Sequence, residues 1–229
     1  MEQQILVDSL VLVPKILNHQ HLQDMMELQQ LAKKQMDSTD TLQPLSRDEF
    51  QYIFSGNGLL IGLFDGQQLV AFRALLVPFI DGEHLGMDAG LSLEALSRVV
   101  YQELSIVHPA YRGKGLQLQM GEILMDNIDR SRFDYVCATV APFNIPSLKD
   151  KFALGLHIVA LKHKYGGKLR YVFLKNLKDE KVEYSRSQDE KLIPMTDTLM
   201  QQKLLNEAYV GVGMSSLNEE WHVQYQREF

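Results

Sequence analysis

Apolar residues in the first part of the chain follow a helical spacing and then a strand-like one. Residues 18–36, NHQHLQDMMELQQLAKKQM, place most apolar side chains three or four positions apart, which predicts an amphipathic helix. In SRDEFQYIF, Ser46 is followed three residues later by Glu49, a capping pair that predicts the start of a second helix. The runs GLLIGLF and QLVAFRALLV flank the tripeptide DGQ, and an Asp-Gly pair between apolar runs predicts a β-hairpin.

Two further stretches lie before and after these elements. The start, MEQQILVDSLVLVP, is apolar only for a short run, carries acidic residues and has neither a basic region nor a small-residue cleavage site. It therefore predicts a strand rather than a secretory signal or a membrane span. Residues 78–98 contain three glycines and predict a long loop with a short helix over 92–98. A loop of this length is usually functional or mobile.

A strand, a glycine turn, a helix and a second strand follow one another over residues 99–140. VVYQELSIV (99–107) is short and rich in β-formers, and Pro109 and the glycines after it end the run. Apolar residues recur at helical spacing from Leu116 onward, and YVCATV (135–140) is again a short apolar run. This order predicts a βαβ unit with a right-handed crossover.

The remaining segments predict a helix, a second hairpin and a mixed C-terminal part. IPSLKDKFALG has Asn144 as its N-cap, tolerates Pro146 in its first turn and ends at Gly155, so it predicts a helix. LHIVAL and LRYVFL flank KHKYGGK as the strands of a hairpin. The charged residues 178–191 are expected at the surface, MTDTLMQQKLLNEA as a helix, and the last residues as a loop and a short strand at WHVQY.

Composition and charge exclude several classes of protein. With 229 residues and 45% hydrophobic content, the chain is long enough to bury a core. Its 23 Lys and Arg against 29 Asp and Glu give a net charge of −6, which argues against nucleic acid as the main partner because phosphate affinity needs clustered cations. Cys137 is the only cysteine and is expected in the core, so no intrachain disulfide can form and an intracellular, cytoplasmic location is predicted.

The turn before the helix at Leu116 contains Arg112, Gly113, Lys114 and Gly115. The first amide groups of a helix have no internal partner, and the helix dipole places positive charge there, so an anion binds favourably. Glycines keep Cβ atoms out of the way, and the two cations add charge. The alternative is an ordinary charged surface turn, but the position at a helix start favours a phosphate or pyrophosphate site.

Two common nucleotide-binding patterns are absent from this turn. The P-loop pattern fails because no glycine stands five residues before the pair Gly113 and Lys114. The dinucleotide pattern fails because Leu118 stands where its third glycine belongs. Neither class of nucleotide is therefore supported.

Residues 112–117, RGKGLQ, resemble motif A of the GNAT superfamily of N-acetyltransferases, whose pattern Q/R-x-x-G-x-G/A holds the pyrophosphate of acetyl-CoA. The preceding VHPAY is similar to the family's V-x-P-x-Y lead, and Gln117 replaces the final Gly or Ala. RGKGLQ and YGGKLR are also similar to segments of a group of bacterial members.

A second stretch resembles motif B of the same superfamily, N-x-x-S/A followed by a helix and then Gly-aliphatic. Asn144, Ser147, Gly155 and Leu156 stand at the expected offsets. The order of predicted elements over about residues 1–178 also agrees with the superfamily.

The resemblance implies an α/β fold, α+β by some schemes, with a mixed central sheet, splayed fourth and fifth strands, and helices on both faces. It assigns 1–178 to a GNAT domain and leaves 179–229, the C-terminal extension, packed on or continuing that domain, either over the cleft or as an interface. It also implies that the pantetheine arm lies between the splayed strands. The implied cofactor-binding residues are Leu104, Ser105, Ile106, Val107, Arg112, Gly113, Lys114, Gly115, Leu116, Gln117, Asn144 and Ser147.

The implied activity is direct transfer of the acetyl group of acetyl-CoA to a primary amine of a small molecule or peptide, without a metal. The alternative is a CoA- or acyl-CoA-binding module with little or no turnover and a sensing or partner-binding role. The expected partner is the amine acceptor, with no nucleic acid and no membrane, and the expected state is a monomer or homodimer. The sequence leaves the acceptor and the choice of acyl group open.

Two residues are candidates for proton transfer. Glu103 lies in an otherwise apolar strand, where burial raises a carboxyl pKa, and is the candidate general base; the alternative is a solvent-facing residue or an ion-pair partner. Lys151 stands where the family has a tyrosine acid, and its alternative is a solvated charge on a helix face. Thr139 takes the position of a Glu in some relatives. Tyr111, Tyr165 and Tyr171 are further candidates for the acid, which the sequence does not rank. His108 beside the motif could shuttle a proton, and its alternative is a loop histidine at the edge of the cofactor.

Overall fold

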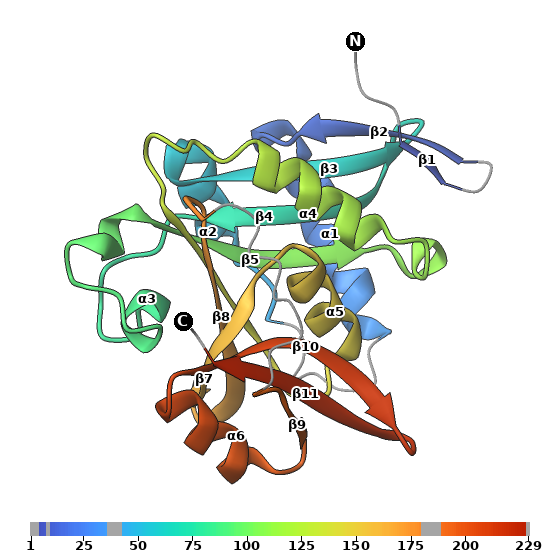
Figure 1. Cartoon of the computed structure of the whole chain (residues 1–229). Coiled ribbons are helices and arrows are strands. Elements are labelled where there is room, and N and C mark those ends of the chain that lie inside the picture. The colour runs from blue at the N-terminus through green and yellow to red at the C-terminus, as the bar shows by residue number, and fades with distance from the viewer. Residues whose placement is uncertain (1–4, 8–9, 36–42, 180–188, 228–229) are drawn as a thin grey trace. The chain divides into compact units, whose positions relative to one another are not determined.

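The strands and helices that the apolar pattern predicts pack into two units (Figure 1). The computed structural model describes residues 5–7, 10–35, 43–179 and 189–227. The first unit comprises Met1–Val77 and Val100–Ile128, and the second comprises Pro78–Val99 and Asp129–Phe229. Within the described ranges, no helix has both the length and the apolar character needed to cross a membrane.

Alternating hydrophobic residues give the first unit an antiparallel sheet. Its strands are neighbours in the order β1 (Ile5–Val7), β2 (Leu10–Ile16), β3 (Gly58–Asp65), β4 (Gln68–Leu76) and β5 (Val99–Val107). The hairpin predicted around DGQ is confirmed as β3 and β4, and Gly66 in its turn has a φ of 58°, a left-handed value that favours glycine. The apolar start of the chain forms two strands where one was predicted, with residues 8 and 9 outside the described ranges.

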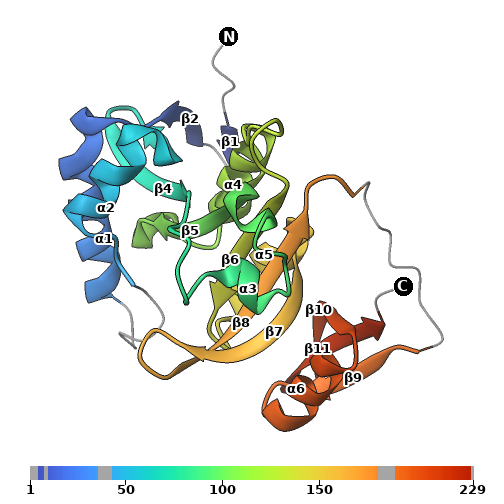
Figure 2. The same cartoon turned by 90° about the vertical axis from the view of Figure 1, so that its left-hand side faces the viewer.

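Helices cover both faces of this sheet. The helical elements are η1 (His19–His21), α1 (Leu22–Lys34), α2 (Arg47–Tyr52), η2 (Ile53–Asn57), η4 (Pro109–Tyr111) and α4 (Leu116–Asp126). α1 and α2 bury Met25 and Phe50 against one face, and α4 buries Leu116 and Met120 against the other. Figure 2 shows α1 and α2 on one side of β4 and β5, and α4 on the opposite side. Each such buried side chain stabilises the fold by about 1.5–3 kcal/mol.

The predicted helix starts and ends of this unit are largely confirmed. Ser46 and Glu49 form the predicted capping box, because each side chain accepts a hydrogen bond from the other residue's backbone N–H. The helix predicted over 18–36 begins as η1 and ends at Lys34, and residue 36 lies outside the described ranges.

The second unit contains a further antiparallel set of strands. They are neighbours in the order β6 (Tyr135–Val140), β8 (Lys168–Asn176), β7 (His157–Lys164), β10 (Tyr209–Leu217), β11 (Glu220–Arg227) and β9 (Lys191–Pro194). Its helices are α3 (Leu85–Asp88), η3 (Ala95–Arg98), α5 (Ile145–Ala153) and α6 (Thr198–Asn206). The predicted hairpin around KHKYGGK and the predicted helices at 145 and 198 are confirmed. The splay between 99–107 and 135–140 involves one strand from each unit and stays a prediction.

The prediction for the last residues of the chain is confirmed at WHVQY, which lies within β11, but it is wrong for the residues before that strand. Residues 209–217, expected as a loop, form β10, which pairs with β11 along its length and with β7 at Ile158. Gly211 suits this close pairing, because a Cβ built there would lie 3.0 Å from Cβ of Ile158. The same glycine weakens the strand pattern, since glycine is depleted in strands. The predicted helix in 78–98 is the short η3, and α3 was not predicted.

A fully buried glutamine joins the C-terminal elements to β8. Oε1 of Gln201 on α6 accepts hydrogen bonds from the hydroxyls of Tyr171 and Tyr225 at 2.7 and 2.9 Å. Its Nε2 donates to the carbonyls of Pro194 and Met195 at 3.0 and 3.1 Å. These bonds connect α6, β8, β11 and the chain after β9. The division of the chain at residue 178 stays a prediction.

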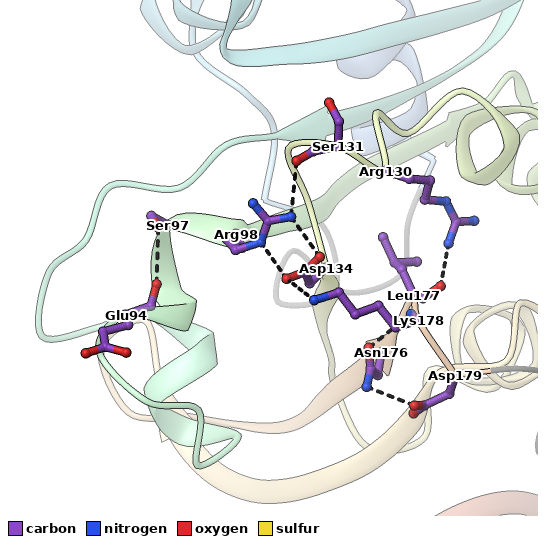
Figure 3. Close-up of polar contacts among 10 residues, drawn as sticks. All are labelled: Glu94, Ser97, Arg98, Arg130, Ser131, Asp134, Asn176, Leu177, Lys178 and Asp179. Carbon is purple, nitrogen blue, oxygen red and sulfur yellow. Dashed lines mark hydrogen bonds and ion pairs between the residues drawn. The ribbon is translucent and has the colours of Figure 1, made fainter.

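A buried carboxylate connects three segments of the second unit (Figure 3). Oδ1 of Asp134 accepts a hydrogen bond from Nη2 of Arg98 at 2.8 Å, and Oδ2 accepts from Nε of Arg98 and, at 2.8 Å, from Nζ of Lys178. The backbone N–H of Leu177 donates to the carbonyl of Asp134 at 2.7 Å. The hydrogen bonds from Arg98 and then Lys178 hold the pKa of Asp134 well below its usual range. Asp134 thus links the end of η3, the start of β6 and the residues that follow β8.

Candidate functional site

The turn formed by residues 112–117, called here the glycine turn, has a backbone that requires glycine. Gly113 and Gly115 have φ values of 78° and 72°, in the left-handed region that other residues avoid. A Cβ built at Gly113 meets no described atom within 4 Å, and one at Gly115 meets only Nε2 of Gln119 at 3.9 Å. Glycine is therefore needed at these positions for the backbone conformation and not for lack of space for a side chain. No described atom covers the backbone of the turn at Gly113.

The start of α4 has no side-chain cap among the described residues. Gly115 is the N-cap and has no side chain to accept a hydrogen bond from the first-turn amides. Those amides have no acceptor within the helix, and the helix dipole adds partial positive charge beside them. Arg112 is exposed and Lys114 is half-buried. The predicted arrangement of amides and cations at a helix start is therefore present.

Side chains next to the glycine turn hold it against the sheet. The hydroxyl of Tyr111 donates to Oδ2 of Asp65 at 2.7 Å, and this bond raises the pKa of Tyr111. The N–H of His108 donates to the carbonyl of Val70 at 2.8 Å, while its Nδ1 accepts from the N–H of Ala110 at 3.2 Å. His108 and Tyr111 thus have structural roles at the entry to the turn.

Two buried polar atoms near α4 and β5 have no protein partner in the described part of the chain. They are Oγ of Ser105 on β5 and Oε1 of Gln119 in α4. Buried polar atoms are nearly always hydrogen-bonded in folded proteins. Together with the open turn, these atoms fit the binding of an extended polar molecule along β5 and the start of α4.

The other predicted residues of β5 alternate in environment. Leu104 and Ile106 are buried in the core cluster under α1 and α2, so their side chains stabilise the fold. Ser105 and Val107 are half-buried. Any contact of Leu104 or Ile106 with a ligand would thus have to involve the backbone.

Glu103 lies at an irregularity of β5. Leu104 pairs with Ala74 and Gln102 pairs with Leu75, which leaves Glu103 as the extra residue of a β-bulge. Solvent reaches its side chain, but dense surrounding protein removes much of the carboxylate's hydration. This desolvation, and then the negative charge of Glu49, raises the pKa of Glu103 to about 7. The exposed position of the side chain agrees with the solvent-facing alternative. The ion-pair alternative is not supported, because an ion pair would lower the pKa of the carboxyl group.

The second unit holds the remaining predicted cofactor residues. Oδ1 of Asn144 accepts a hydrogen bond from the N–H of Ser147 at 3.4 Å, as the predicted N-cap of α5. Gly155 ends the helix with a φ of 75°. The predicted site residues therefore form two sets: those of β5 and the glycine turn lie in the first unit, and Asn144, Ser147 and Lys151 lie in the second.

Lys151 does not have the solvated position that its alternative requires. It is only 7% exposed, and its Nζ lies 3.1 Å from Oδ2 of Asp150, which is buried as well. The ammonium group is thus paired inside the protein, on the side of α5 that faces the core.

The tyrosines differ in their environment. Tyr171 is fully buried and bonded to Gln201, and burial raises the pKa of its hydroxyl far above the usual value. Tyr165 is 43% exposed, and its hydroxyl lies 3.2 Å from Oγ1 of Thr139 on β6. Tyr165 also has a φ of 52°, which is strained for a residue with a side chain. Unlike Tyr111 and Tyr171, it combines solvent access with a hydroxyl at the end of β6.

Sequence reasoning missed Arg73 and Gln102. Arg73 on β4 is 1% exposed, and its guanidinium contacts Gln102 and the first turn of α4. The sequence could have indicated this residue, because Arg73 is the one charged residue in the apolar run QLVAFRALLV. The described residues contain no cluster of three or more His, Cys, Asp or Glu side chains suited to a metal ion.

Comparisons with known proteins identify the fold. No family model matches the sequence, and no curated protein matches it. The structure is similar to the ribosomal-protein-S18-alanine N-acetyltransferase of Escherichia coli, with a TM-score of 0.54, 14% identity, and coverage of 76% of this chain and 99% of that one. It is also similar to the GNAT domain of S. lividans PAT, with a TM-score of 0.55, 14% identity, and coverage of 77% of this chain and 97% of that one.

A third similar structure holds a cofactor. It is a protein from Salmonella typhimurium, provisionally described as an acetyltransferase, in complex with its cofactor acetyl-CoA. The TM-score is 0.54 at 16% identity, with coverage of 77% of this chain and 99% of that one. At these identities the similarity establishes the fold: the chain has the mixed α/β fold of the GNAT acetyltransferases.

Proposed function

We propose that this chain, which has the GNAT fold, is an acetyl-CoA-dependent N-acetyltransferase that transfers the acetyl group directly to a primary amine of a small molecule or peptide. The observation that carries the proposal is the open glycine turn at the start of α4. Gly113 and Gly115 adopt left-handed conformations there, and no described atom covers the backbone at Gly113.

The first-turn amides of α4 would hold the diphosphate of the cosubstrate, and Arg112 and Lys114 would add positive charge. The backbone of residues 104–107 and the unpaired Oγ of Ser105 would bond the pantetheine arm. The cofactor roles of Asn144 and Ser147, which lie in the second unit, stay predictions. When bound, acetyl-CoA supplies the acetyl thioester that the amine attacks.

Glu103 would accept the proton that the amine releases. Its pKa of about 7 lets it be deprotonated at slightly alkaline pH and still be basic enough to take a proton. The bulge on β5 explains how a carboxylate can leave the regular alternation of an apolar strand. The negative charges of Glu103 and Glu49 would also attract a cationic amine.

A second proton transfer would neutralise the departing thiolate, and of the two candidates in the second unit we propose Tyr165 rather than Lys151. Lys151 is buried beside Asp150, whereas the hydroxyl of Tyr165 is partly open to solvent beside Thr139. The buried state of Lys151 is also the observation that favours the alternative function, a CoA-binding module with little turnover. Both functions require the glycine turn, but only the enzyme requires Glu103.

A thiol-release assay separates the two functions. Wild-type protein with acetyl-CoA and a panel of primary amines should release CoA with a rate that rises with pH through about 7, as Glu103 loses its proton. Glu103→Gln should lower kcat by about 10²- to 10⁴-fold and remove this pH dependence. Glu122→Gln, which changes an exposed carboxylate on α4, is the matched control. Thermal stabilisation by acetyl-CoA without release for any amine would favour the binding module.

A further inference from the structure

A buried arginine lies directly beneath the glycine turn. Nη1 of Arg73 donates to the carbonyl of Gln117 at 2.7 Å, and Nη2 donates to Oε1 of Gln102 on β5 at 2.7 Å. Nε2 of Gln102 in turn lies 3.3 Å from Sδ of Met125, near the other end of α4. Arg73 and Gln102 thus connect β4 and β5 to both ends of the helix whose first turn faces the proposed diphosphate.

The burial of a charged side chain at position 73 needs a physical explanation. A guanidinium stays protonated at every pH at which proteins are folded, so Arg73 places a full positive charge in the interior. Burying a charge is costly even when it is hydrogen-bonded. A cation is useful here if an anion binds nearby.

The position of Arg73 relates it to the proposed cofactor site. Its cross-strand partner on β5 is Ser105, so the two side chains project from the same face of the sheet, and Oγ of Ser105 is one of the buried atoms without a described partner. Gln117 is the second residue of α4, and a phosphate bound to the first-turn amides would be about 10 Å from the guanidinium, given the rise and radius of a helix. At that distance and an effective dielectric constant of about 20, one charge changes anion affinity by about tenfold.

We propose that Arg73 is a positioning residue for coenzyme A: it fixes the first turn of α4 against β4 and β5, and its buried charge strengthens diphosphate binding without touching the ligand. This inference rests on the proposed function, because it requires that the glycine turn binds coenzyme A. It adds a charged residue outside the motif that resembles motif A.

Calorimetric titration of the full chain with CoA, and with pantetheine as the ligand without phosphates, tests the role. Arg73→Gln should weaken CoA binding about tenfold and leave pantetheine affinity within about twofold, because only CoA carries the diphosphate. Arg47→Gln, which removes an exposed cation from α2 in the same unit, is the control and should change neither affinity. Equal losses for both ligands would indicate a purely structural role and would overturn the proposal.

A second variant covers the case in which Arg73→Gln fails to fold. In Arg73→Lys the buried amine can lose its proton, and burial lowers the pKa of a lysine. The affinity of this variant for CoA should therefore fall as pH rises from about 7 to 10, beyond any fall seen for wild type, whose arginine keeps its charge. An identical pH dependence in the two proteins would contradict the proposal.

The proposed function and the role of Arg73 can be refuted separately. If wild type binds CoA and both Arg73 variants bind it in the same way as wild type, the role of Arg73 is wrong and the proposed function stands. If folded wild type binds no CoA, the proposed function is wrong, and the role of Arg73 falls with it.

Discussion

Replacing Gln201 with methionine tests how the C-terminal elements are held. Methionine has a similar length and shape but makes none of the four hydrogen bonds of Gln201. The hydroxyls of Tyr171 and Tyr225 are fully buried, and burial raises the pKa of both, so they remain protonated donors in the folded protein. The variant therefore leaves buried groups without partners.

The expected loss of stability follows from those groups. The hydroxyls of Tyr171 and Tyr225 lose their acceptor, and the carbonyl of Met195 loses the donor that the Gln201 amide supplied. The carbonyl of Pro194 still accepts a hydrogen bond from the N–H of Asp197 at 3.0 Å. An unsatisfied buried polar group costs about 1–3 kcal/mol, so one carbonyl and two hydroxyls predict a loss of about 4 kcal/mol in the free energy of unfolding. Losses above about 4 kcal/mol are exceptional for single substitutions, which makes this a demanding prediction.

Urea unfolding followed by far-ultraviolet circular dichroism measures the loss. Lys203→Met, two residues further along α6 at an exposed position, is the matched control and should change stability by less than about 0.5 kcal/mol. Gln201→Glu adds a pH test, because its carboxylate would face the carbonyls of Pro194 and Met195 and its pKa would be raised. Its stability should thus fall, relative to wild type, as pH rises above about 4.3. A Gln201→Met variant within 0.5 kcal/mol of wild type would refute the reasoning.

Three further predictions address the rest of the structure. Asp134→Asn should lower the melting temperature at neutral pH, and the difference from wild type should shrink as pH falls below about 4. The reason is that the lowered pKa of Asp134 stabilises the folded state fully above about pH 4, and this stabilisation is lost as the carboxylate gains a proton. A constant difference across pH would contradict this. Gly113→Ala should weaken CoA binding in calorimetry and cost about 1 kcal/mol of stability, because alanine is strained at its left-handed φ. Gly82→Ala is the control and should leave CoA binding unchanged, because the φ of Gly82 is not positive. Equal CoA binding by the two variants would argue against the glycine turn as the binding site. Tyr165→Gly should raise the melting temperature, because glycine relieves a backbone strain of about 1 kcal/mol at the positive φ of this residue. The same variant should lower kcat, and an unchanged kcat would exclude Tyr165 as the general acid.

Much of the fold follows from local patterns in the sequence. The Asp-Gly turn between β3 and β4, the cap at Ser46 and the strand at 99–107 depend on residues close together in the chain, and the structure confirms all three. The β10 strand was missed because its stability comes from distant partners: Gly211 weakens the local pattern but lets the strand approach Ile158 on β7.

The candidate site was predictable only in part for the same reason. The left-handed glycines at 113 and 115 follow from a motif of a few residues, and Glu103 stands out as a charge in an apolar strand. Its bulge, however, depends on the register between β4 and β5, and the influence of Glu49 depends on how α2 packs against the sheet. Such long-range contacts are not encoded in local periodicity.

The paired state of Lys151 and the buried position of Arg73 were also not predicted from the sequence, because both depend on contacts that local spacing does not show. Helical spacing alone did not show that Lys151 would be buried beside Asp150, because α5 is short and both of its faces carry charged residues. Arg73 was overlooked because its neighbours are apolar and its hydrogen-bond acceptors lie 29 and 44 residues further along the chain.

Isothermal titration of purified, folded wild-type chain with coenzyme A tests the central claim most directly. The open glycine turn at the start of α4 should give saturable binding of one CoA per chain, weakened by added salt because charged groups bind the phosphates. A folded protein that takes up no CoA at millimolar concentration would contradict the account.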